Sequence, residues 1–394
     1  MTALQDVEGL VKTTHNESAR QAFISALRKH IMVDMRENLR GHYEQDVKPA
    51  YARTNGSFPQ NGEEVRAVLD DDLYYQMWGT MRYNAQEMTW ASVQEPIERS
   101  LPDMIEVACI AAKSKRAGGS LSLNPKIEIP DYVTAMDVHL MPGCFHSEFA
   151  KDDVAQGAVL SYGGRVFSGG MVHRRGGGGV VAESIAQYIK HKYPGFEPRK
   201  ILDLGCCSGR NLFPYAKIFS GIEAYGIDVA APVLRYGHAM SEYNGQAIHY
   251  AQQNAEALEF KDNIFDVVTS SFFLHELPVK STVQVFSEAL RVLKPGGIMI
   301  HMELPPNSEC DPFYACYLDW DNFHNNEPNY MRFRSQDMED LCTRGGFGKS
   351  DYFQSLIPNY RSFGEEKFAA FVRGEVLAPE HGNGASWFVF GAHK

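Results

Sequence analysis

The fold can be inferred from one short stretch, ILDLGCCSGRN, at residues 201–211. Its apolar start, Ile201–Leu204, predicts a buried strand, and Gly205 and Gly209 predict a tight turn before a helix that begins near Arg210. Such a turn lets the backbone approach a ligand and points helix N-terminal N–H groups at it. Nicotinamide and flavin enzymes share this arrangement, so the turn alone does not identify the ligand.

Polar residues around the turn narrow the choice of ligand. Asp203, inside the strand, would repel a pyrophosphate and favour a cationic amino-acid head group. Asp228 ends the next apolar run, where a carboxylate can accept both hydroxyls of a ribose. Asn254 and Ala255 follow the third run, where a side-chain amide and a backbone N–H can bind an adenine edge. Further on, LKPGG at 293–297 predicts a helix stop followed by a tight turn.

The region from Val180 onward alternates helical patterns with short apolar runs. This alternation is typical of a mostly parallel sheet with helices on both faces. The expected strands are KILDLG (200–205), EAYGIDV (223–229), AIHYA (247–251), FDVVTSS (265–271), GIMIHMEL (297–304) and WFVFGAHK (387–394).

Taken in order, these motifs resemble the class I S-adenosylmethionine-dependent methyltransferases that act on small molecules, and the resemblance covers residues 180–394. It implies an α/β fold with a Rossmann-like, seven-stranded, mostly parallel sheet and a reversed last hairpin. It also implies S-adenosyl-L-methionine as the cofactor. The cofactor-binding positions it assigns are Asp203, Gly205, Cys207 and Gly209 in the turn, Asp228 and Val229 at the ribose, Asn254 and Ala255 at the adenine, and Ser270 at the methionine.

The sequence departs from this family at two positions. Cys207 replaces the middle glycine of the turn, and Asn254 replaces the usual adenine-side aspartate. A cysteine is small enough to preserve the turn if its dihedral angles lie in an allowed region. An amide both donates and accepts hydrogen bonds, so Asn254 can still bind the adenine edge.

Methyl transfer depends mainly on aligning the nucleophile, the methyl group and the sulfur in a dry pocket. A hydroxyl or carbon acceptor also benefits from a general base. His275, in SSFFLHELP beyond the fourth strand, is the predicted base, and Glu276 could orient it or act instead. This favours an oxygen or carbon acceptor, while sulfur and nitrogen stay open. The alternative is that His275 only packs locally.

Residues 1–116 are predicted to be helical and to cap the pocket or form a homodimer. Phe23, Leu27, Ile31, Met35 and Leu39 recur every four residues, which places them on one helix face. A second helical region runs from 63 to 90, and the prolines at 96 and 102 are expected to break it before a short helix near 103–115.

Residues 117–179 form a connector with many glycines and prolines, interpreted as a lid over the pocket. KIEIP (126–130) and VTAMDVHL (133–140) have β-like patterns, and Gly176–Gly179 predict a hinge after a surface pair, Arg174 and Arg175. Several metal-ligand types crowd into this connector, but their spacing matches no metal motif, and no metal is predicted. They are Asp137, His139, Cys144, His146, Glu148 and His173.

The segment 314–334 follows the fifth strand, where the family commonly places substrate contacts. It is dense in aromatic and polar side chains, which favours a binding surface over a packed face. The predicted substrate residues are Tyr314, Tyr317, Trp320, His324, Tyr330 and Arg332.

Composition sets the broad class of the protein. The 394 residues carry a net charge of −11 spread over both halves, which argues against a nucleic-acid partner. No secretory signal or membrane span is apparent, and seven cysteines without a C-x-x-C pair indicate reduced thiols, so we expect a cytoplasmic protein.

Two rival functions remain open at this point. An NAD-dependent oxidoreductase would need a G-x-G-x-x-G turn with no preceding acid, and neither feature is present. A catalytically silent S-adenosylmethionine-binding scaffold is suggested by Cys207 and Asn254.

Overall fold

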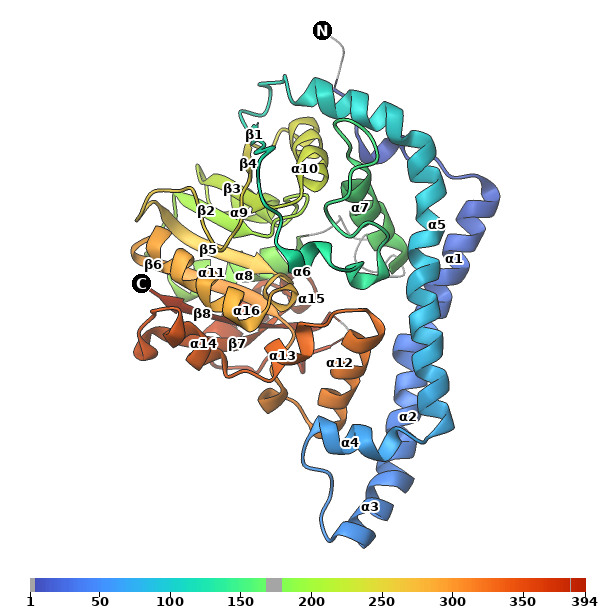
Figure 1. The fold of residues 1–394 in the computed structure, drawn as a ribbon. Helices are drawn as coiled ribbons and strands as arrows, with labels where there is room; N and C mark the ends of the chain where they lie inside the picture. The colour runs from blue at the N-terminus through green and yellow to red at the C-terminus, as the bar shows by residue number, and fades with distance from the viewer. Residues whose placement is uncertain (1–3, 168–178, 383) are drawn as a thin grey trace.

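The structure, a computed structural model, describes residues 4–167, 179–382 and 384–394. Residues 176–178 of the predicted hinge Gly176–Gly179, together with His173, Arg174 and Arg175, lie outside the described residues. The described residues form one eight-stranded sheet in the order β1-β4-β3-β2-β5-β6-β8-β7, with β8 antiparallel to both of its neighbours (Figure 1). Its strands are β1 (Ser120–Ser122), β2 (Lys200–Leu204), β3 (Glu223–Asp228), β4 (Ile248–Gln252), β5 (Phe265–Ser271), β6 (Leu293–Glu303), β7 (Tyr352–Pro358) and β8 (Ser386–His393).

The predicted Rossmann-like sheet is confirmed, and the connector adds an eighth strand to it. All six expected runs form strands, β2 to β6 and β8, and β7 completes the reversed hairpin with β8. The extra strand β1 pairs in parallel with β4. The connector and the α/β region therefore share one sheet.

The two β-like pieces of the connector were predicted wrongly. Asp131–Thr134 forms the short helix α6 after Pro130, and Val138–Leu140 forms a 3₁₀ turn. Residues 126–130 form no strand, and Tyr132, Val133 and Val138 line the cavity at the carboxyl ends of the strands, where no strand of the sheet pairs with them. A strand needs such a partner for its N–H and C=O groups.

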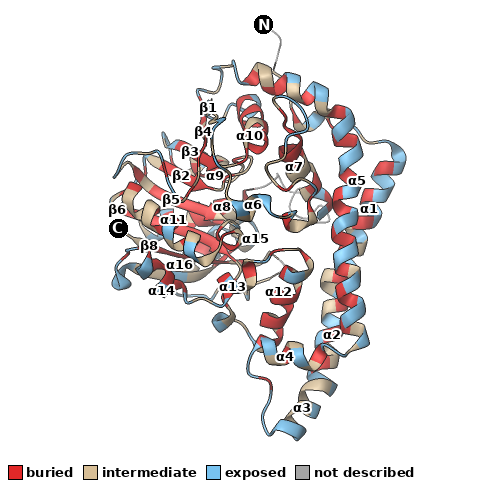
Figure 2. Cartoon of the chain, viewed as in Figure 1, coloured by how far each residue is buried: buried red, intermediate tan, exposed pale blue. Residues whose placement is uncertain are grey.

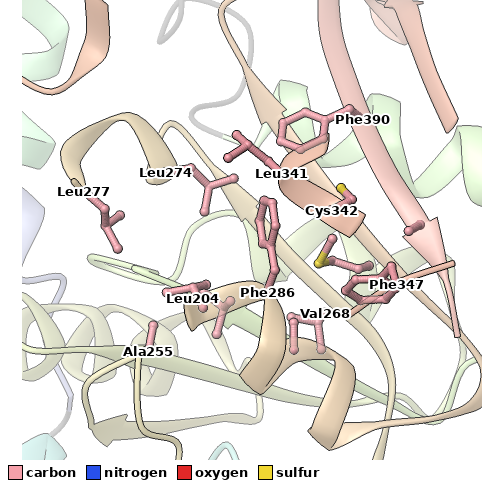
Figure 3. Close-up of a cluster of buried hydrophobic side chains, with 14 of the residues drawn as sticks. Leu204, Ala255, Val268, Leu274, Leu277, Phe286, Leu341, Cys342, Phe347 and Phe390 are labelled. Atoms are coloured by element: carbon pink, nitrogen blue, oxygen red, sulfur yellow. The ribbon is translucent and has the colours of Figure 1, made fainter. Parts of the chain in front are cut away.

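Helices cover both faces of the sheet because successive strand residues point to opposite sides. On one face, α11 (Val279–Val292) and α14 (Met338–Arg344) pack on Leu204, Val268 and Met299, and Figure 3 shows part of this core around Phe286 and Phe390. On the other face, α8 (Val180–Lys192), α9 (Leu212–Ile218), α10 (Ala231–Asn244) and α16 (Glu365–Val372) pack on Ile201 and Val267.

The mainly helical N-terminal part is confirmed, but its prolines do not break it. Helix α5 runs without interruption over Leu73–Ala111, through Pro96 and Pro102, along one side of the molecule (Figure 1). A proline leaves the carbonyl four residues earlier without its helical donor. For Pro96 that carbonyl belongs to Ser92, and the Gln21 side chain donates to it at 2.9 Å. Buried packing of Val93 and Ile97 adds to this support.

The first helical stretch is also longer than expected. It runs from α1 (His15–Lys29) through α2 (Arg36–His42) to α3 (Lys48–Asn55), joined by π-helical turns at His30–Met35 and Tyr43–Val47. The predicted face is right for Ile31, Met35 and Leu39, but Phe23 is 59% exposed. A strict four-residue spacing drifts around a helix of 3.6 residues per turn, so Gln21 and Ile24 take the buried positions instead. Figure 2 shows both buried and exposed residues along α1 and α5.

Two further helices join this part to the α/β region. Helix α7 (Ala155–Phe167) packs between α5 and α10, and α12 (Pro312–His324) packs against α5 and α4 (Gly62–Leu69). Among the described residues, no helix has both the length and the apolar character that crossing a bilayer requires.

Candidate active site

A cavity of about 260 Å³ lies at the carboxyl ends of the central parallel strands. Ligands of open α/β sheets bind at this edge, where the strand order reverses between β2 and β5. The sheet contributes Gly205, Cys207, Ile227, Asp228, Val229, Gln253, Asn254, Ala255, Ser271, Phe272, Phe273, Glu276 and Leu277 to its lining. The connector and α7 contribute Tyr132, Val133, Val138, His139, Cys144, Phe145 and Leu160.

The turn after β2 has the backbone that its glycines predict. Gly205 adopts φ +61° and Gly209 φ +71°, conformations that favour glycine. A side chain at Gly205 would collide with Phe273, and one at Gly209 with the Tyr250 hydroxyl. Gly205 lines the cavity, whereas Gly209 serves the close approach of Tyr250 and does not line it. Cys207 also has a positive φ, +49°, which lies in the small left-handed region at some conformational cost.

The carboxylate of Asp228 is fixed at the cavity wall by two backbone donors. The Cys207 N–H donates to Oδ2 at 3.0 Å, and the Ala230 N–H donates to Oδ1 at 2.9 Å. Each carboxylate oxygen has a second lone pair, so both stay able to accept from a ligand hydroxyl. Asp228 is therefore suited to hold a vicinal diol such as a ribose.

Asp203 lies directly behind the turn, is only 1% exposed and does not itself line the cavity. Its Oδ2 atom has no hydrogen-bond partner. Burial, assisted by the nearby Asp228 carboxylate, raises the pKa of Asp203 to about 8. A buried carboxylate without a partner is costly, and a cationic ligand group would relieve that cost. The residues of this edge thus fit a ligand with a ribose and a positively charged end.

Two other predicted cofactor positions differ in detail. The Asn254 Oδ1 atom accepts from the Glu256 N–H at 2.9 Å, so the side chain stabilises its own turn and leaves its NH₂ group for a ligand. Ser270 is fully buried, and its hydroxyl is hydrogen-bonded to His301 Nδ1 at 2.7 Å. Because side chains alternate along a strand, the neighbouring Ser271 lines the cavity in its place.

The predicted catalytic pair is split by the structure. His275 is only 2% exposed and lies behind the cavity wall. Its ring stacks on that of Tyr330, with the ring centroids 3.8 Å apart. Its Nδ1 is 2.6 Å from Glu303 Oε2, while Phe273 and Leu274 N–H groups donate to the other oxygen of Glu303. Glu276, in contrast, lines the cavity.

His139 is a cavity residue that the sequence analysis did not assign to the active site. Its Nε2 is 3.2 Å from Glu276 Oε1, and its Nδ1 is 2.8 Å from Glu327 Oε1. Its carbonyl accepts from Gln86 Nε2 and Trp90 Nε1 of α5, which fixes its left-handed backbone, φ +59°. A signal existed in the sequence, because His139 lies among the metal-ligand types of the connector.

The pKa values of His139 and Glu276 are shifted mainly because these side chains pair with oppositely charged neighbours. Burial opposes the charged form of His139, but the carboxylates of Glu327 and Glu276 outweigh burial and raise the pKa of the imidazole to about 10. Burial alone would raise the pKa of Glu276, but the imidazoles of His139 and His275 lower it to about 2. The cavity therefore has one strongly polar end in an otherwise largely apolar lining.

The predicted substrate residues lie elsewhere. Tyr317 and Trp320 stack on Trp78 of α5, with the Trp78 and Trp320 ring centroids 3.4 Å apart. Of the six residues, all of which the structure describes, none lines the cavity. Tyr314 borders a separate groove and His324 another, Tyr330 lies beneath His275, and Arg332 is exposed. The dense aromatic pattern thus marks helix packing between α12 and α5.

Comparison with known proteins shows which family the central strands and the turns after them resemble. Residues 202–301 match the family model described as Methyltransferase domain. A demethylmenaquinone methyltransferase from Thermus thermophilus is 32% identical over 28% of this chain and 49% of its own length. A ubiquinone/menaquinone biosynthesis C-methyltransferase from Shewanella halifaxensis is 30% identical over 42% of this chain and 59% of its own. The chain thus spans about half the length of these curated relatives.

Among solved structures, phosphoethanolamine N-methyltransferase 2 from Haemonchus contortus, in complex with S-adenosyl-L-methionine, is also similar. It is 18% identical, with 54% of this chain and 52% of that chain covered, at a TM-score of 0.38. The resemblance to class I S-adenosylmethionine-dependent methyltransferases is confirmed by the domain match and the curated relatives, and the oxidoreductase hypothesis finds no support in them.

Proposed function

We propose that this protein, which carries an S-adenosylmethionine-dependent methyltransferase domain, methylates a small, neutral, largely apolar acceptor at oxygen or carbon. The observation that carries the proposal is the composition of the cavity. The turn residues suited to the cofactor, Cys207 and Asp228, and the polar end formed by His139 and Glu276 line the same cavity.

For the cofactor we propose the following contacts. Asp228 and Val229 would hold the ribose, and Asn254 and Ala255 the adenine edge. Gly205 gives the backbone room to approach the methionine end, and Asp203 behind it would lose its proton on binding and supply the negative charge that the ammonium needs. When bound, S-adenosyl-L-methionine supplies an electrophilic methyl group on a sulfonium. Gly209 and Ser270 support this edge from behind and are not proposed as contacts.

The acceptor side of the cavity favours an uncharged molecule. Val138, Phe145, Leu160 and Phe272 offer apolar surface there. Among the described residues, no lysine or arginine lines the cavity, and the His139 imidazolium is already paired with Glu276 and Glu327, so a phosphate or carboxylate on the acceptor would find no free cationic partner. The polar group that undergoes methylation would face His139 and Glu276.

The chain's contribution to the reaction would be alignment and control of one proton. Connector residues from Tyr132 to Phe145 form a lid that excludes water and holds the acceptor for in-line displacement. Glu276 is proposed as the catalytic residue that contacts the acceptor's reacting group. His275, which is held by Glu303, is reassigned from base to positioning residue for Glu276. A carboxylate that can remove a proton from the acceptor favours methylation at oxygen or carbon over methylation at sulfur.

A separate proposal concerns self-association through the N-terminal helices. Phe58, Leu73 and Met77 are 51%, 80% and 47% exposed in this region. Large exposed apolar side chains often mark interfaces. Sedimentation velocity should show a dimer that is lost in Leu73→Lys; a monomer at high concentration would contradict the proposal.

Calorimetric titration with S-adenosyl-L-methionine tests the proposed function. We expect saturable binding by the wild-type protein and about 100-fold weaker binding by Asp228→Ala, because that variant loses charge-assisted hydrogen bonds to the ribose. Glu223→Ala, at the exposed start of the same strand, is the matched control and should bind normally. Absence of wild-type binding at millimolar cofactor would refute the function.

A further inference from the structure

Three side chains from separate segments meet at the polar end of the cavity. His139 comes from the 3₁₀ turn at Val138–Leu140, Glu276 from the 3₁₀ turn at Leu274–Glu276, and Glu327 from the loop after α12. One ligand atom from each lies within 4.8 Å of the other two. Two of the three, His139 and Glu276, also face the cavity.

The side chains around this polar end carry a negative net charge that a divalent cation would neutralise. Glu276 and His139 connect to His275 and Glu303, so three carboxylates and two imidazoles form one buried set. Even with both imidazoles protonated, the set carries a net charge of −1. The ion pairs seen for its carboxylates among the described residues are with these histidines. An uncompensated buried charge is costly, and a divalent ion in place of the proton on His139 makes the set neutral.

Asn325 gives a second, independent indication. It is 95% buried, and its Nδ2 lies 2.8 Å from His139 Nδ1 and 2.9 Å from Glu327 Oε1. Its Oδ1 atom is buried without any hydrogen-bond partner. A half-turn of the amide exchanges its nitrogen and oxygen, and would bring the unpartnered oxygen onto an ion held between His139 and Glu327. A fourth ligand is thus available at the site.

From these residues we infer a divalent-cation site formed by His139, Glu276 and Glu327, with Asn325 as a further oxygen ligand. One imidazole nitrogen with carboxylate and amide oxygens suits first-row ions such as Mn²⁺ or Zn²⁺. His275, bound to Glu303, orients Glu276 in the way that outer partners orient metal ligands. The absence of a metal motif in the connector is explained, because two of the ligands come from elsewhere in the chain.

The position of the site gives the ion a role that rests on the proposed function. Because His139 and Glu276 line the cavity, the open coordination positions face the acceptor. An ion there would bind the acceptor's oxygen and lower the pKa of the proton that leaves. One oxygen of Glu276 would hold the ion, and its other oxygen would accept that proton while the acceptor stays in line with the methyl group. The acceptor class narrows accordingly to a molecule with a hydroxyl or an enolisable carbonyl.

Direct metal binding by the full-length protein tests the site. After chelation and desalting, we titrate the protein with Mn²⁺ and follow free Mn²⁺ by electron paramagnetic resonance, and with Zn²⁺ by equilibrium dialysis and elemental analysis. We expect one equivalent per chain. His139→Ala and Glu327→Gln should each weaken binding at least about 100-fold, and Glu303→Gln about 10-fold. His30→Ala, an exposed histidine on an outer helix, should bind like the wild type.

The outcomes separate this site from the proposed function. Circular dichroism melting confirms that each variant folds, and Glu327→Gln preserves the shape of the side chain if His139→Ala fails to fold. Less than one tenth of an equivalent in the wild type, or unchanged binding in folded His139→Ala and Glu327→Gln, overturns the metal site. Methyl transfer that persists in chelator then leaves the proposed function standing. Conversely, stoichiometric metal with no cofactor binding retains the site and refutes the function.

Discussion

The two walls of the cavity are built in different ways. The cofactor wall is made largely of backbone turns that follow β2, β3 and β4, and its acid Asp228 is held by two backbone N–H groups. The acceptor wall is made of side chains from the connector, from the turn after β5 and from the loop after α12. One wall is thus part of the sheet, whereas the other depends on how α5 and α12 hold distant segments together.

The largest loss of stability is expected from a substitution that removes packing behind the acceptor wall and leaves the cofactor wall unchanged. Trp320 is 4% exposed and stacks on Trp78, so Trp320→Ala should lower the free energy of unfolding by about 3–5 kcal/mol. Turnover should fall as well, while cofactor affinity in the folded protein changes less than twofold. Denaturant unfolding and calorimetry provide the two measurements.

Phe323→Ala, on the same helix but 60% exposed, is the matched control and should cost less than about 1 kcal/mol. If Trp320→Ala weakened cofactor binding as strongly as turnover, the two walls would not be independent.

Removing the charge of Glu276 tests the polar end directly. Glu276→Gln should lower kcat about 100-fold, because the variant loses the carboxylate that faces the reacting group, with cofactor affinity nearly unchanged. Steady-state kinetics on the methylated acceptor measure this. Glu309→Gln, an exposed glutamate in another groove, controls for the loss of one negative charge and should retain full activity. Equal turnover in the two variants would remove Glu276 from the mechanism.

The cofactor wall could be predicted because its residues act through local backbone. Asp203, Gly205 and Asp228 each follow from a strand and the turn at its end, and those are short-range patterns. The same reasoning was wrong by one residue at β5, where it assigned Ser270 to the cavity. Side chains alternate between the two faces of a strand, and Ser271 is the residue that lines the cavity. The sheet was predictable for the same reason, apart from β1, whose three residues carry almost no pattern, and β7, whose residues were not predicted although the resemblance implied a last hairpin.

The acceptor wall could not be predicted, because its residues meet only through tertiary packing. Nothing in the sequence joins His139 to Glu276 or Glu327, which lie in distant segments. Trp320 and Tyr317 were assigned to the substrate because aromatic density is typical of both binding surfaces and helix interfaces. Pro96 suggested a helix break, and the hydrogen bond that compensates for it comes from Gln21 in another helix.

A smaller effect concerns the proton on Asp203. Its folded-state pKa, about 8, lies above its ordinary value near 4, so its protonated form favours folding. That contribution is fully present below about pH 4 and is lost as the pH rises through 8. The ligand-free wild type should therefore lose stability across this range, and Asp203→Asn should flatten the profile.

Binding of a cationic cofactor near Asp203 should also release about one proton at pH 7. Titration calorimetry in two buffers with different ionisation enthalpies measures the number. No proton release in the wild type, or equal release in Asp203→Asn, would contradict the assignment of Asp203 to the cationic end.

The smallest change in stability is expected from substitutions at Cys207 in the turn after β2. Cys207 has φ +49°, which costs a non-glycine residue about 1 kcal/mol. Cys207→Gly relieves this cost but adds chain entropy to the unfolded state, so it should stabilise the protein by less than about 1 kcal/mol. Cys207→Ala retains the strain and should show no gain. Thermal melting of the two variants compares them, and destabilisation by glycine would argue that the Cys207 side chain itself is needed.

The most direct test of the central claim, that the two walls form one methyl-transfer site, is transfer of an isotopically labelled methyl group. The protein is incubated with methyl-labelled S-adenosyl-L-methionine and host metabolites, and products are detected by mass spectrometry. We predict a labelled, neutral product bearing the methyl on oxygen or carbon, absent with Asp228→Ala and strongly reduced with Glu276→Gln. A labelled product formed equally by both variants, or one carrying a phosphate or carboxylate, would contradict it.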